Sequence, residues 1–170
     1  MNRQTFDVRV RTHHYVELRD KQGVLKWSDD LYNLVVTAGL NKLLDATFKT
    51  GLEVPAWYVG LVDGGSEPAY SADDTMASHA GWAENNAYTE QVRQTFTPGT
   101  IAAGAVDNSD SRAVFTISSD GAFAGCFLAD EAVENGEEVT LYGEGAFTGG
   151  ARPVEIGDTL RVTTTISVEE

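Results

Sequence analysis

The sequence contains few of the residues from which catalytic and metal sites are usually built. It has one cysteine, Cys126, and three histidines among 170 residues. A single cysteine excludes an internal disulfide bond and a zinc site made from several cysteine thiolates. The chain also lacks an apolar run close to the roughly 18 residues that a membrane span needs, and its first residues lack the apolar core of a secretory signal. We therefore expect a protein that is made in a cytoplasm and has no membrane partner.

Basic residues are scarce over most of the chain. The net charge is −14, and residues 1–49 contribute +2 while residues 50–170 contribute −16. Such a negative field repels nucleic acid and anionic membranes, and it suits high solubility or a partner with a basic surface. We therefore predict that nucleic acid is not a partner.

The sequence does contain a series of short segments typical of β-strands. Residues 158–168 alternate between apolar and polar side chains, as a half-buried strand does. Residues 122–128 do not alternate, so we expect them to be covered on both faces. Turn residues between the segments favour a β-sandwich or barrel. A hairpin is predicted over residues 15–27, and the further candidate strands are residues 56–62, 88–96, 112–118, 121–129, 138–147 and 158–168.

One helix is predicted, and it begins at Thr37, which suits the N-cap position. Leu40, Leu43, Leu44 and Phe48 follow at the spacing of one helical face. We expect this apolar face to pack against the core as a lid.

The histidines, the cysteine and the aspartates do not assemble a reaction centre in the sequence. PAWYVGLVDG, residues 55–64, predicts a buried strand that ends in a turn at Asp63. His79 lies in a long loop, residues 64–86, with no second histidine or nucleophile motif nearby. An apolar strand raises the pKa of Cys126 and leaves the thiol unreactive. We therefore predict that the chain is not an enzyme and has no catalytic residue and no cofactor.

Two acidic groups raise the question of calcium, and they are Asp63 with residues 73–74, and residues 107–110. Neither follows the spacing of an EF-hand loop with its distant glutamate. Asp, Asn and Ser at these places are typical of turns, because their side chains bond to their own backbone. We predict no metal site, and the sequence leaves open whether these loops bind calcium.

A linked set of short motifs is spread over roughly residues 33–168. The motifs are NLVVTAGLNKLLDATF (33–48), WYVGLV (57–62), PAY (68–70), DTMASHAGW (74–82), YTE (88–90), LYG (141–143) and GDTL (157–160). Each motif is weak alone, and the set is specific. Together they resemble a family of small virion proteins of tailed bacteriophages.

Some members of this family resemble capsid decoration, or cement, proteins. The resemblance implies a mainly β fold, a jelly-roll-like antiparallel β-sandwich with one short helix. It implies a structural protein on the capsid exterior that binds and stabilises the lattice of the major capsid protein, and we expect a homo-oligomer. An alternative is a tail or baseplate adaptor that attaches a fibre. Another is a glycan-binding module that uses Trp82, Tyr70 and Tyr88 as a stacking platform.

The resemblance begins near Asn33, so residues 1–32 are predicted to be an added N-terminal arm and hairpin, and residues 33–170 the body. Such an extended arm is able to add a strand to a neighbouring subunit's sheet through backbone hydrogen bonds. The candidate partner-binding residues of the arm are Phe6, Val8, Arg9, Val10, Arg11, His13, His14 and Tyr15.

Overall fold

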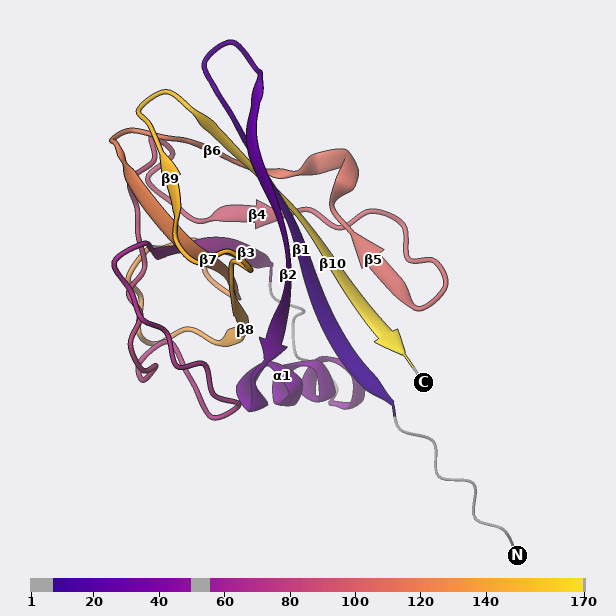
Figure 1. Cartoon of the computed structure of the whole chain (residues 1–170). Helices are drawn as coiled ribbons and strands as arrows, with labels where there is room; N and C mark the ends of the chain where they lie inside the picture. The colour runs from indigo at the N-terminus through magenta and orange to yellow at the C-terminus, as the bar shows by residue number, and fades with distance from the viewer. Residues whose placement is uncertain (1–7, 50–55, 170) are drawn as a thin grey trace, which may run out of the picture.

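The computed structural model describes residues 8–49 and 56–169. Within these ranges the chain is mainly β, with ten strands and one α-helix (Figure 1). The elements are β1 (Arg9–Arg19), β2 (Leu25–Val35), α1 (Thr37–Phe48), β3 (Trp57–Asp63), β4 (Gln94–Phe96), β5 (Ala105–Asp107), the 3-10 turn η1 (Ser109–Ser111), β6 (Ala113–Thr116), β7 (Gly121–Ala129), β8 (Leu141–Ala146), β9 (Arg152–Val154) and β10 (Thr159–Glu169).

The strands form an antiparallel sheet that curls into a half-barrel (Figure 1). Their order is β4-β3-β7-β8-β2-β1-β10-β5, with β6 also paired to β10 and β9 to β7. The end of β2 joins the two halves of the sheet, because Leu34 and Val35 pair with Glu144 and Gly143 of β8. A mainly β protein with one helix in the described residues is therefore confirmed, and a jelly-roll sandwich is not.

The prediction that residues 9–19 belong to an arm added to the body is wrong. These residues form β1, which lies between β2 and β10 and pairs with both (Figure 1). Thr12, His14, Val16 and Leu18 point inward from it and are fully buried. A strand that is paired on both edges has no backbone groups left for a neighbour's sheet. Phe6, the first of the predicted arm residues, lies outside the described ranges.

The predicted boundary between residues 32 and 33 falls inside β2, so the structure does not divide the chain there. Leu31 precedes the boundary and belongs to the same buried cluster as Leu160 near the C-terminus. The hairpin that joins β1 to β2 was predicted correctly. Its turn is held by the Asp20 carboxylate, which accepts hydrogen bonds from the backbone amides of Gln22 and Val24 at 2.9 and 2.8 Å.

Two apolar clusters lie on opposite faces of β7, which is why its central residues do not alternate. The larger cluster fills the inner face of the curled sheet and includes Phe123 and Leu128. The second cluster lies on the other face, under the loop of residues 64–86, and includes Phe127, Trp82 and Met76. The expectation that residues 122–128 are covered on both faces is therefore confirmed.

Candidate docking surface

Helix α1 approaches the sheet at its N-terminal end. A Cβ atom on Gly39 would lie 2.3 Å from the backbone oxygen of Tyr142 in β8, so only glycine permits this contact. Val36 occupies the N-cap position, and the Thr37 side chain makes no cap hydrogen bond, although the helix does begin at Thr37. The Thr37 amide instead donates to the Ala72 oxygen at 2.7 Å. The helix is thus fixed to the body by its first turn.

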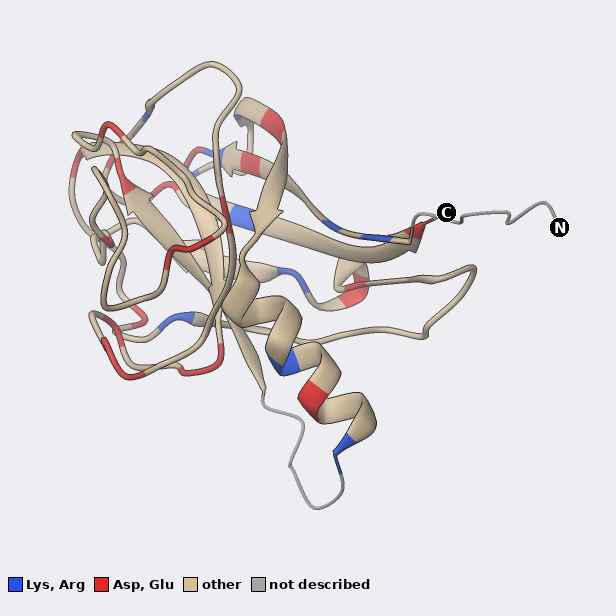
Figure 2. Ribbon diagram, turned by 90° about the horizontal axis from the view of Figure 1, so that it is seen from below, with Lys and Arg blue, Asp and Glu red and all other residues tan. Residues whose placement is uncertain are grey.

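The apolar stripe of α1 faces outward beyond that turn. Leu43 packs against the larger cluster, but Leu40, Leu44 and Phe48 are 38%, 55% and 77% exposed. Figure 2 shows the helix projecting away from the sheet toward its C-terminal end. The prediction that this face covers the core is therefore correct for Leu43 and wrong for the other three residues, because helical spacing gives a stripe but not the direction in which the stripe points.

A hollow of about 480 Å³ continues this stripe onto the sheet. Its lining includes Leu40 from the helix, Tyr32 from β2 and Val8 just before β1. Tyr32 and Val8 are 69% and 66% exposed, and Leu34 lies two residues from Tyr32 on the outward side of β2. We name the combined region the α1 surface. It consists of Val8, Tyr32, Leu34, Leu40, Leu44 and Phe48.

Basic side chains surround the α1 surface, and most of them are already paired. Arg11 bonds to Glu169 at 3.0 Å, Lys42 to Asp130 at 3.2 Å, and Lys49 to Asp45 at 2.5 Å. Arg9 lines the same hollow. The rim is therefore close to neutral, whereas residues 50–170 carry −16. A nearly neutral rim adds little charge repulsion of its own at the place where a partner would make contact.

The predicted arm residues are divided between this surface and the interior. Val8, Arg9, Val10 and Arg11 line the hollow. His13 packs on the Tyr32 ring and bonds to Asp30, and Tyr15 is half-buried; both belong to β1. His14 is fully buried. Tyr32 and Leu34 were not predicted to belong to a binding surface. They alternate along β2 with the buried Leu31 and Asn33. This alternation is the signal that would have placed their side chains on the outer face.

His14 has a structural role in the interior. The Asn33 side-chain amide donates to its Nε2 at 2.6 Å, and its Nδ1 then donates to the Thr164 hydroxyl at 2.7 Å. Burial, together with the charge of His13, lowers the pKa of His14 to about 3. The imidazole is therefore neutral, bonded on both sides, and out of reach of a partner.

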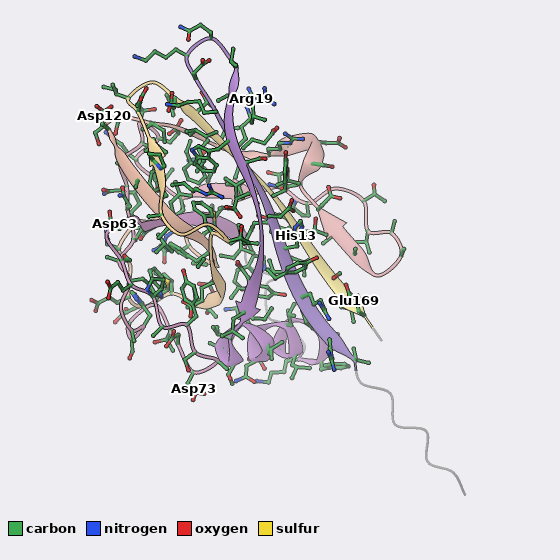
Figure 3. The ribbon with its side chains drawn as sticks, viewed as in Figure 1. His13, Arg19, Asp63, Asp73, Asp120 and Glu169 are labelled. Atoms are coloured by element: carbon green, nitrogen blue, oxygen red, sulfur yellow. The ribbon has the colours of Figure 1, made fainter. Side chains whose placement is uncertain are left out.

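The other candidates that the sequence offered do not converge. Figure 3 shows His13 on β1 well separated from Asp63 at the end of β3 and from Asp73 in the long loop. Asp63 holds a turn, because its carboxylate accepts hydrogen bonds from the Gly65 amide and the Asn85 side chain. Burial raises the pKa of the Cys126 thiol, as predicted. Within residues 8–49 and 56–169, no group of three or more His, Cys, Asp or Glu side chains is placed to hold a metal ion.

The predicted glycan platform is not exposed. Trp82 and Tyr88 are buried in the two apolar clusters, and Tyr70 packs against the second cluster. A sugar ring stacks on an accessible aromatic face, so these three rings do not form such a platform in this conformation.

A search of protein-family models finds no match to this chain, and a search of curated proteins finds none either. Among the helices that the structure describes, none is long and apolar enough to cross a membrane.

Proposed function

We propose that this chain is a structural virion protein of a tailed bacteriophage that decorates the capsid exterior and binds the major capsid protein through the α1 surface. The observation that carries the proposal is the outward apolar stripe of Leu40, Leu44 and Phe48. The motif set of residues 33–168 supports the virion setting by resemblance. A jelly-roll relationship for the half-barrel and a homo-oligomeric state belong to the same proposal.

A contiguous exposed apolar region on an acidic chain is typical of a surface that binds a partner. Apolar residues three or four positions apart along one helical face are the anchors by which an amphipathic helix enters an apolar groove. Leu40, Leu44 and Phe48 have this spacing, and the hollow beside Tyr32 extends the contact area. A capsid repeats its surface many times, so modest contacts of this kind stabilise the shell by mass action.

The proposal is tested by co-sedimentation of the purified chain with empty capsids of the phage that encodes it. Phe48→Ser and Leu44→Gln remove exposed apolar groups without touching the core. We expect each to weaken binding about tenfold or more if it is an interface anchor.

Matched controls come from elsewhere on the chain. Ile101, between β4 and β5, is 76% exposed, and Val133, between β7 and β8, is 56% exposed. Ile101→Ser and Val133→Gln therefore change similar amounts of apolar surface away from α1. Equal binding by all four variants and the unmodified chain would contradict the role of the α1 surface. Binding to tails or baseplates but not to capsids would favour an adaptor instead.

A further inference from the structure

A carboxyl group is buried inside the second apolar cluster. Glu144 of β8 is 0% exposed and pairs with Phe127 of β7 on one side and Leu34 of β2 on the other. Paired residues of antiparallel strands point to the same face, so the Glu144 side chain lies beside the Phe127 ring. Trp82 packs on that ring from the loop of residues 64–86, with 5.2 Å between the ring centres.

The polar atoms around Glu144 are poorly satisfied. Neither of its carboxyl oxygens has a hydrogen-bond partner of good geometry among the described residues, and the same holds for Trp82 Nε1 and the Tyr70 hydroxyl. Asp74, which is 8% exposed, brings a second carboxyl group close to the first. Unpartnered buried polar groups are rare in folded proteins, and an ionised carboxylate in such a place is strongly unfavourable.

Protonation removes that penalty. Burial and the neighbouring Asp74 carboxyl raise the pKa of Glu144 to about 8, although the Trp82 indole and the Ser71 amide oppose the shift. At neutral pH the side chain is therefore mostly an uncharged carboxylic acid in the closed structure.

The other ionisable groups from the loop and from β7 do not supply a compensating charge. Burial raises the pKa of Tyr70 and of Cys126, so both are neutral near pH 7. His79 is half-buried, stacks on Trp82 at 3.7 Å between ring centres, and lines a small pocket with it.

Two cations from neighbouring elements are already engaged. Arg93 lies over the Phe127 ring at 5.2 Å, and two of its nitrogens bond to the Glu84 carboxylate at 2.8 Å. Lys42 of α1, the helix that packs on β8, pairs with Asp130. Neither is available to neutralise an ionised Glu144.

The loop that covers Glu144 is bonded to the sheet at its two ends, where the Gly64 amide donates to the Ala122 oxygen and the Asn85 amide donates to the Leu61 oxygen. It folds back on itself through hydrogen bonds from the Glu67 amide to the Gly81 oxygen and from the Ala69 amide to the Ala80 oxygen. Gly81 has a positive φ of 77°, and a Cβ there would lie 2.2 Å from the Glu67 oxygen. The Ala72 oxygen of the loop also accepts a hydrogen bond from the amide of Thr37, the first residue of α1.

We propose that the loop of residues 64–86 is a pH-dependent cover, which closes over the second apolar cluster while Glu144 is protonated and opens when Glu144 loses its proton to water. Opening exposes Trp82 and Phe127 and lets the Glu144 carboxylate become hydrated. The direction of this pH dependence follows from the difference in proton affinity of Glu144 between the closed and the open loop. A carboxyl group whose pKa is raised from 4.5 to about 8 binds its proton more tightly in the closed state, so closure weakens as the pH rises through this window.

The test is amide hydrogen exchange of the full chain between pH 5 and 8, expressed as protection factors that correct for the intrinsic pH dependence. The amides of Glu67 and Thr37 report loop closure, and amides of β1 and β10 serve as an internal reference. We expect the loop protection factors to fall by up to about tenfold per pH unit as the pH rises, while the protection factors of the reference amides do not fall, because His14 in β1 makes the sheet more stable as the pH rises toward 6.5.

Glu144→Gln keeps the shape of the protonated acid and carries no ionisable proton, so its loop protection should be independent of pH. Glu67→Gln changes an exposed carboxyl of the same loop and should keep the profile of the unmodified chain. A flat profile in the unmodified chain, or an unchanged slope in Glu144→Gln, would overturn the proposal.

If the Gln variant does not fold, the carbon-13 titration of the Glu144 carboxyl in the unmodified chain decides. A midpoint well above 4.5 supports the proposal, and a midpoint at 4.5 overturns it.

Discussion

At the scale of single residues, the interior of the sheet contains a histidine, His14, whose neutral form fits its two hydrogen-bond partners. His14 accepts one hydrogen bond and donates another, from Asn33 and to Thr164. Protonation would turn Nε2 into a second donor facing the donor amide of Asn33. The folded protein therefore resists protonation of His14.

We predict that the free energy of unfolding falls in acid and that His14 accounts for part of this fall. Because its pKa falls from 6.5 to about 3 on folding, the unfolded chain takes up the proton first, and stability is lost as the pH falls below 6.5. Between pH 6.5 and 5 the contribution is about 2 kcal/mol. Urea unfolding of the chain and of His14→Gln at several pH values measures it. The variant should be less stable at pH 7 and lose less on acidification, and parallel curves would contradict the assignment.

Two phenylalanines provide a second test at this scale. Phe127 is 0% exposed, so Phe127→Ala should lower the free energy of unfolding by about 3–5 kcal/mol. Phe48 lies on the α1 surface, and Phe48→Ala should change the free energy by less than about 0.5 kcal/mol. Thermal or urea unfolding of both variants checks this. A large loss for Phe48→Ala would mean that the helix stripe packs against the body after all.

At the scale of elements, helix α1 depends on one close contact. Replacing glycine by alanine inside a helix normally stabilises it by up to about 1 kcal/mol. Gly39→Ala should do the reverse, because the new methyl group meets the Tyr142 backbone. Asn41→Ala, at an exposed position of the same helix, is the matched control and should be neutral or slightly stabilising. Both are measured by urea unfolding, and a stabilised Gly39→Ala would show that α1 is held away from β8.

The elements also show what the sequence is able to predict. Residues 121–129 were predicted as a strand and form β7 with the same limits, because an apolar run of this length between turn residues favours a fully buried strand. The predicted strand of residues 88–96 is reduced to β4, and β5 and β9 were missed, since three residues are too few to show an alternation.

The candidate site was less predictable than the strands. The spacing of Leu40, Leu44 and Phe48 was recognised, but a stripe that contacts a partner and a stripe that contacts the core have the same spacing. The inward face of β1 was not recognised, because it includes the polar residues Thr12 and His14. Polar residues at these positions are typical of a solvent-exposed segment. Their burial depends on partners far away in the chain, such as Thr164.

At the scale of the whole molecule, both ends of the chain contribute to one sheet. β1 pairs with β10 from Arg9↔Glu169 to Arg19↔Thr159. Deleting residues 1–19 should therefore unfold the protein, because it removes a strand from the middle of the sheet, whereas deleting residues 1–7 leaves every described strand intact. Circular dichroism and urea unfolding of the two truncations check this. A folded chain without residues 1–19 would contradict the central position of β1.

The copy number of this chain in purified virions decides whether it decorates the capsid. Quantitative mass spectrometry gives the ratio of this chain to the major capsid protein. A protein that decorates the capsid lattice predicts about one copy per copy of the major capsid protein. A ratio far below one would place the chain at the tail or at a vertex, and its absence from virions would contradict the structural role altogether.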